Sequence, residues 1–297
     1  MNDVPAFIGI GVPKAGTTSL HHYLDQHPGI FMATKEPHYF LHAKGRRPWR
    51  GPGDAASTRN DIHEWPAYQA AFARAEGRLA GEFSPQYLAD AEVPRRIKER
   101  LPDARFIAVL RDPVQRAYSN YLHLRRNHRE PLGSFRDALA KEDERLAAGW
   151  EPFWGYRTQS RYGTNFQPWL EAFPRDRFFV LTLHELQARP AVTMDRLHDF
   201  LGVEPHRPDF LVHNPGGVGR LDAVQQRLLR RSPLGGLTRH LLPRSVRMRV
   251  HLALRRLNSK VPPLAPADEA WLRQEFLPEV ELVERQFDLD LAAWKPT

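Results

Sequence analysis

Apolar and polar positions follow a regular pattern up to about residue 202. Short apolar runs with the length and composition of buried strands cover residues 6–10, 30–32, 79–83, 105–110 and 177–183. Amphipathic helical spacing covers residues 17–27, 66–75, 92–101, 113–123, 134–148, 162–173 and 190–201. Strands that alternate with helices are typical of a parallel sheet with helices on its faces. The pattern therefore predicts an α/β domain with a central, mostly parallel five-stranded sheet flanked by helices.

Residues 42–64 and the last third of the chain depart from this pattern. Residues 42–64 are polar and rich in Gly, Pro and Arg, which predicts a long loop of the kind that borders a substrate cleft. Residues 213–220 are a glycine-rich turn, and residues 267–287 have the spacing of an acidic amphipathic helix. Because no repeat or linker is visible, we expect a single domain over residues 1–297. Its core would cover about 6–202, with helical segments of residues 213–290 packed on it.

Residues 220–260 form a strongly basic segment. It contains eleven Lys or Arg residues against a single acid, Asp222, with Leu and Val between them at roughly helical spacing. A solvated basic helical face is one interpretation. The others are a wall for an anionic cofactor or acceptor, and a peripheral contact with an anionic membrane or acidic glycan.

Composition narrows the classes of function. The chain has no cysteine, which excludes disulfides, thiolate metal sites and a cysteine nucleophile, and fits a reducing compartment. No apolar run is long enough to span a membrane, and no signal peptide is evident, so we expect a cytoplasmic protein with membrane association as an alternative. The formal charge of +8 suits an anionic ligand, and at this point leaves nucleic acid open.

The most informative stretch is GIGVPKAGTTSL at residues 9–20. A strand should precede it and a helix should begin at Gly16 or Thr17, so that free N–H groups and the positive end of the helix dipole form an anion site. The spacing of Gly11 and Gly16 is close to a Walker A loop, but Thr17 replaces the usual lysine and Lys14 lies inside the loop. A strand-to-helix turn without a ligand is the alternative.

A second cation follows another predicted strand. Residues 105–110 end in Arg111-Asp112-Pro113, and ligands of open α/β sheets bind beyond the carboxyl ends of strands. The misplaced lysine, and the lack of a strand ending in a metal-holding Asp, argue against an ATP or GTP enzyme. Two separated anion sites instead fit a nucleotide with phosphoryl groups at both ends of its ribose. Ser119 and His123 share one face of the following helix.

These motifs resemble those of the PAPS-dependent sulfotransferases. Residues 13–20 resemble their 5′-phosphosulfate loop, and residues 111–119 resemble their 3′-phosphate motif. The heparan sulfate N- and 3-O-sulfotransferase branch and its bacterial relatives are similar at KEPHYF (35–40), Ser84-Pro85-x-Tyr87 and Arg161-Tyr162-Gly163. The resemblance covers about residues 7–202. It implies a P-loop-like, three-layer fold and transfer of a sulfuryl group from PAPS to a hydroxyl or amine of a carbohydrate, glycolipid or other small acceptor, with neither metal nor nucleic acid.

The resemblance also implies roles for individual residues. Lys14 would stabilise the leaving phosphate, Glu36 would be the general base, and His123 would lie near the acceptor. The residues that would bind the nucleotide are Lys14, Ala15, Gly16, Thr17, Thr18, Ser19, Arg111, Ser119, Tyr162, Gly219 and Arg220.

Phe83 and Lys35 are expected to lie beside the general base, Glu36. Many relatives carry a basic residue just before Ser-Pro in the third strand, where this chain has Phe83, and Lys35 is a candidate replacement. Pro37 should hold Glu36 in an extended conformation, and Lys35 and Glu36 should then point to different places.

The alternatives to a sulfotransferase are a P-loop kinase or NTPase, and a non-catalytic basic module that binds anions.

Overall fold

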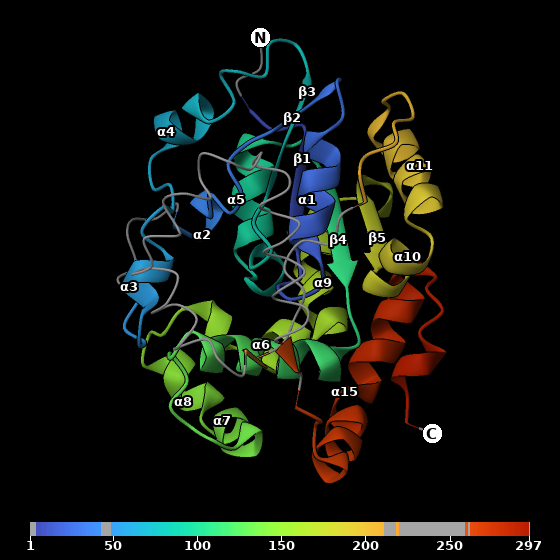
Figure 1. Ribbon diagram of the computed structural model, residues 1–297. Coiled ribbons are helices and arrows are strands. Elements are labelled where there is room, and N and C mark those ends of the chain that lie inside the picture. Colours follow the sequence, from blue (N-terminus) through green and yellow to red (C-terminus); the bar gives the residue numbers. More distant parts are fainter. Residues whose placement is uncertain (1–3, 43–48, 211–217, 220–258, 261, 297) are drawn as a thin grey trace, which may run out of the picture.

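The centre of the computed structural model is a parallel sheet in the order β2-β3-β1-β4-β5 (Figure 1). The structure describes residues 4–42, 49–210, 218–219, 259–260 and 262–296. The strands are β1 (Phe7–Gly11), β2 (Ile30–Met32), β3 (Leu79–Phe83), β4 (Arg105–Leu110) and β5 (Phe178–Thr182). The five predicted strands and their parallel pairing are confirmed.

Helices cover the sheet on its two faces. In Figure 1, α1 lies in front of the sheet and α9 behind it, where α9 contacts α5 and α15. The helices up to α6 are α1 (Thr17–Asp25), α2 (Tyr39–His42), α3 (Asp54–Ser57), α4 (Trp65–Ala70), α5 (Val93–Arg100) and α6 (Pro113–Arg126). Those that follow are α7 (Phe135–Ala140), α8 (Glu142–Ala147), α9 (Tyr162–Ala172), α10 (Leu183–Ala188), α11 (Pro190–Leu201) and α15 (Pro266–Phe287).

The predicted single helix over residues 134–148 is wrong, because the chain forms α7 and α8 with Lys141 between them. The fully buried Glu142 at the start of α8 explains the break. Its carboxylate accepts hydrogen bonds from the backbone N–H groups of Arg157 and Thr158, at 2.7 and 2.8 Å. This long-range contact sets the direction of α8, and no local pattern of apolar residues reports it.

Three short helices were also missed. α2 follows the turn at Glu36, and α3 lies inside the predicted loop of residues 42–64. α10 begins directly after β5, where Thr182 and Glu185 form a reciprocal capping box, so that the strand ends at Thr182. The predictions for residues 213–217 and 220–258 lie outside the described residues. Val218–Gly219 (β6) and Ser259–Lys260 (β7) pair as short antiparallel strands.

Glycines let aromatic rings pack between neighbouring strands. A Cβ atom at Gly81 of β3 would lie 2.1 Å from the ring of Phe7, and one at Gly9 of β1 would lie 2.1 Å from the ring of Phe83. Both rings are fully buried. This exchange of small and large residues fixes β1 against β3, and thereby fixes the loop that leaves β1. Among the residues described, no helix is long and apolar enough to cross a membrane.

We predict that Gly81→Ala lowers the free energy of unfolding by about 1–3 kcal/mol, because the added methyl group overlaps the Phe7 ring. Denaturant unfolding followed by circular dichroism measures the change. Gly133→Ala is the matched control, since a Cβ atom there meets nothing within 4 Å. Equal stability of the two variants would contradict the packing argument.

Candidate active site

The loop between β1 and α1 forms an uncapped helix N-terminus. Gly16 occupies the N-cap position with φ of 87°, and no side chain caps the first turn of α1 within the described parts of the chain. A Cβ atom at Gly16 would lie 2.7 Å from Leu183 of α10, so both the left-handed backbone and the close packing require glycine. The Ser19 N–H bonds to the Gly16 carbonyl at 2.9 Å, so the N–H groups of Thr17 and Thr18 are the ones that face an anion at this end of α1.

A cavity of about 1070 Å³ opens beside this loop. It brings together most of the site residues predicted from the sequence: Lys14, Gly16, Thr17, Thr18, Ser19, Glu36, Arg111, Ser119 and His123. The two predicted anion motifs, separated by about a hundred residues, thus line one pocket.

Two further predicted residues, Ala15 and Tyr162, do not line this cavity. Ala15 is fully buried, and its N–H donates to the Val12 carbonyl at 3.3 Å. Tyr162 is also fully buried, and its hydroxyl donates to the Arg111 carbonyl at 2.7 Å. Tyr162 therefore positions Arg111 from behind the pocket, and its contact with a nucleotide stays a prediction. Gly219 lies in β6, and Arg220 lies outside the described residues.

Arg111 connects the two anion motifs directly. Its guanidinium Nη1 donates to the Lys14 carbonyl at 3.1 Å. Burial lowers its pKa from the ordinary value, and Tyr162 and Asp112 oppose this shift. Asp112 caps α6 by accepting from the Gln115 N–H at 3.0 Å, so the motif also starts the helix that carries Ser119. Arg116 of the same motif is fully buried and donates to Ser160 at 2.6 Å, which makes it a structural residue.

Two cations and an aromatic residue of the pocket were not predicted as site residues. Arg126 lies on the pocket side of α6, at seven residues from Ser119, so the helical spacing of Ser119, His123 and Arg126 could have indicated it. Lys35 was named only as a candidate replacement for the basic residue that is absent at position 83. Trp294 reaches the pocket from the end of the chain, for which the sequence contains no local signal.

The amino group of Lys14 lies in a crowded electrostatic environment. Its Nζ atom is 3.1 Å from His123 Nδ1. Burial and, to a smaller extent, the neighbouring cations Arg126, Arg111 and Lys35 together lower the pKa of Lys14 to about 7, against the opposing effect of Glu36. An anionic ligand in the pocket would restore the ordinary charged state of Lys14.

Glu36 does not have the extended backbone that Pro37 predicts. Its φ is 61°, and its N–H donates to the Phe83 carbonyl at 2.8 Å. This turn brings Lys35 and Glu36 to the same pocket, where their side chains form an ion pair, so the prediction that they point to different places is wrong. Burial alone would raise the pKa of Glu36, but Lys35, His38 and Lys14 together lower it.

Phe83 is a core residue in this structure. It is fully buried, and its ring lies 6.1 Å from that of His21 in an edge-on contact. The position expected to carry a basic residue is therefore occupied here by an aromatic ring of the core. Lys35 supplies a cation to the pocket from the neighbouring segment.

A buried histidine–carboxylate cluster lies next to Glu36 and was missed from the sequence. Asp61 accepts from His38 Nδ1 at 3.0 Å and from His42 Nε2 at 2.7 Å. Burial would raise the pKa of Asp61, but the two histidines lower it. Burial would lower the pKa of His38, but Asp61 and Glu36 raise it. The cluster thus places positive charge beside Glu36 and supports its ionised form.

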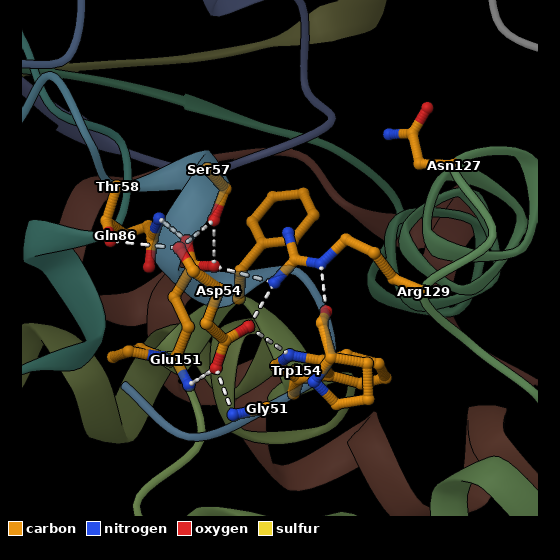
Figure 2. Close-up of polar contacts among 12 residues, drawn as sticks. Gly51, Asp54, Ser57, Thr58, Gln86, Asn127, Arg129, Glu151 and Trp154 are labelled. Atoms are coloured by element: carbon orange, nitrogen blue, oxygen red, sulfur yellow. Dashed lines mark hydrogen bonds and ion pairs between the residues drawn. The ribbon is translucent and has the colours of Figure 1, made fainter. Parts of the chain in front are cut away.

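A second polar network, built around Asp54, borders the pocket on the side of Gln86 and Asn127 (Figure 2). The fully buried Asp54 pairs with Arg129 and accepts from Trp154 Nε1 at 2.8 Å. Glu151 accepts from Arg129 at 2.8 Å, from Gln86 at 3.1 Å and from Ser57 at 2.7 Å. These bonds hold α3 and the chain around Glu151 against the pocket.

The chain is similar to sulfotransferases in sequence and in structure. A model of the "Sulfotransferase family" matches residues 5–208. The human bifunctional heparan sulfate N-deacetylase/N-sulfotransferase 3 is 28% identical over 221 residues, which cover 68% of this chain and 23% of that protein. The mouse heparan sulfate glucosamine 3-O-sulfotransferase 3A1 is 30% identical over 203 residues, covering 68% of this chain and 46% of that protein.

A solved structure extends the similarity to the whole chain. The crystal structure of a sulfotransferase from Alicyclobacillus acidocaldarius superposes with a TM-score of 0.77 at 30% identity and covers 98% of each chain. Together with the observed sheet, this similarity confirms the P-loop-like, three-layer fold.

We predict that Asp61→Asn lowers the free energy of unfolding by about 3 kcal/mol near neutral pH, because it leaves two buried histidines without their carboxylate. The contribution of Asp61 requires a pH above its ordinary pKa and disappears as pH falls through its lowered value. The contribution of His38 to stability disappears as pH rises through its raised pKa. The difference in free energy of unfolding between Asp61→Asn and the wild type should therefore become smaller at low pH, where Asp61 is protonated, and at high pH, where His38 is neutral.

Chemical denaturation at several pH values measures this effect. The control is Asp103→Asn, because the Asp103 side chain is 92% exposed and its ion pair with Arg177 spans 3.6 Å. A stability difference for Asp61→Asn that does not change with pH would argue against the ionic cluster.

Proposed function

The chain belongs to the sulfotransferase family, as its motifs predicted, and on that premise we propose that it transfers the sulfuryl group of PAPS to a hydroxyl or amine of a glycan or other small acceptor. The convergence of two anion motifs on one pocket, with Lys14 and Glu36 both lining it, carries the proposal. The names of the relatives, which refer to heparan sulfate, support a glycan acceptor.

The pocket fits a nucleotide with two separated phosphate groups. At the 5′ end, the uncapped N-terminus of α1 and the hydroxyl groups of Thr17, Thr18 and Ser19 would bind the phosphosulfate. At the 3′ end, Arg111 and Ser119 would bind the phosphate. Glycine at position 16 keeps the left-handed turn that begins α1, and a Cβ atom there would meet Leu183 of the protein.

The two charged groups of the reaction would be Lys14 and Glu36. PAPS supplies the sulfuryl group, and PAP is the leaving group. The ammonium group of Lys14 would stabilise the charge that develops on the leaving phosphate. Glu36, whose pKa is held low, would be ionised and would take the proton of the acceptor hydroxyl or amine as that atom attacks sulfur.

We predict that PAP raises the melting temperature of the protein much more than ADP does, since only PAP offers a 3′-phosphate to Arg111. At about a hundredfold excess over Kd, binding stabilises the fold by about 2.7 kcal/mol. Arg111→Ala should remove most of the PAP shift, while Arg59→Ala, at an exposed position, should retain it. Equal shifts with PAP and ADP in the wild type would reject the donor assignment.

We predict that Glu36→Gln reduces turnover by about 10²–10⁴-fold and leaves the PAP shift intact, because the amide cannot accept the proton. Labelled PAPS and a panel of heparan-type glycans, glycolipids and phenols provide the assay. Glu171→Gln, an exposed change on α9, is the control. A fully active Glu36→Gln enzyme would exclude Glu36 as the base.

A further inference from the structure

His123 receives two cationic donors on one nitrogen atom. His123 Nδ1 lies 3.1 Å from Lys14 Nζ and 3.1 Å from Arg126 Nη2. Ammonium and guanidinium groups donate hydrogen bonds and cannot accept them. The Nδ1 atom must therefore carry a lone pair and no proton.

The other ring nitrogen then carries the proton. His123 Nε2 lies 2.9 Å from Nδ2 of Asn127. In the neutral ring Nε2 is the donor, so the proposed tautomer requires the Asn127 amide to be turned over, with Oδ1 in the place of Nδ2 as the acceptor. The ring of Phe153, 5.5 Å away and edge-on, packs against the imidazole and limits its rotation.

The surroundings keep this imidazole neutral. Burial lowers the pKa of His123 to about 2, and the nearby cations Lys14, Arg126 and Arg129 contribute to the shift. Charging the ring would place a further positive group among these cations. A histidine in this state cannot collect a proton from an acceptor group near neutral pH.

We propose that His123 is a positioning residue: a neutral hydrogen-bond acceptor that holds the ammonium group of Lys14 in place on the pocket wall. The proposal rests on the role of Lys14 in the proposed function and changes the role expected for His123, which was a contact with the acceptor. Without this hydrogen bond, Glu36 is the opposite charge that acts on Lys14 in the pocket. Lys14 would then turn toward Glu36 and occupy the carboxylate that has to accept a proton.

Two variants separate positioning from proton transfer. His123→Asn retains an acceptor oxygen near the place of Nδ1, and His123→Leu retains the size of the side chain without an acceptor. We expect His123→Asn to keep turnover within about tenfold of the wild type and His123→Leu to lose about 10²-fold, comparable to the loss of one catalytic hydrogen bond. Equal, severe loss in both variants, together with a missing limb of the pH–rate profile, would assign His123 to proton transfer and overturn the proposal.

The pH dependence of PAP binding gives a readout that does not need turnover. Lys14 is faced by Arg111 at the end of β4, by His123 and Arg126 of α6, and by Lys35 and Glu36 after β2. PAP should bind the charged form of Lys14 better, so its affinity falls as pH rises through the pKa of Lys14. Loss of the acceptor disfavours the charged form. The fall should therefore move to lower pH in His123→Leu and remain in place in His123→Asn.

Calorimetric titration with PAP across pH measures these curves, with Lys14→Ala as the baseline. Failure of the wild type to bind PAP would reject the proposed function, whereas binding with identical pH curves in all His123 variants would reject the positioning role alone. If the variants do not fold, the nitrogen chemical shifts of His123 in the wild type show which ring nitrogen carries the proton and so test the proposal. We expect protonated Nε2 and unprotonated Nδ1 from about pH 5 to 8, and a protonated Nδ1 would overturn the proposal.

Discussion

The hydrogen bond from the Arg111 guanidinium to the Lys14 carbonyl joins the two halves of the pocket. It fixes the β1–α1 loop relative to the end of β4, and other parts of the fold hold the Arg111 end of this bond in place. Tyr162 binds the Arg111 carbonyl from the start of α9, and Arg273 of α15 binds Asp112 at 3.1 Å. The last helix of the chain therefore contributes to the geometry of a site whose side chains come mostly from residues 14–123.

The contact between the two motifs brings several positive charges close together. Lys14, Lys35, Arg111 and Arg126 all line the pocket, and Glu36 is the acid that opposes Lys14. Such a cluster is unfavourable without an anion: burial lowers the pKa of Lys14 most, and the neighbouring cations lower it further. A neutral hydrogen-bond acceptor such as His123 reduces the repulsion without neutralising the charge that the reaction would use. The stability of the empty site and its affinity for an anion are thus two consequences of one arrangement.

The sequence predicted the sheet well because the strands are local signals. Buried runs such as residues 106–110 are apolar throughout and are bounded by charged residues. The errors occur where a long-range contact overrides a local preference. Glu142 is drawn to the backbone of Arg157 and Thr158 and breaks the expected helix, and the N–H of Glu36 bonds to Phe83 while its φ is positive, against the preference imposed by Pro37. The pairing of Asp61 with His38 and His42 depends on a chain reversal that no periodicity indicates.

The same distinction divides the pocket itself. The side that carries the two predicted anion motifs consists mostly of a contiguous loop and one strand end, so residue types and spacing predicted that these motifs meet there. The side of Gln86 depends on Asp54, Glu151 and Arg129, largely buried groups from separate segments that hold Gln86 in place (Figure 2). A network of this kind is stable only when all its members are paired, so its segments have to be placed together. The motifs that indicate the family are therefore short and local, whereas the shape of the pocket wall near Gln86 arises from tertiary contacts among distant parts of the chain.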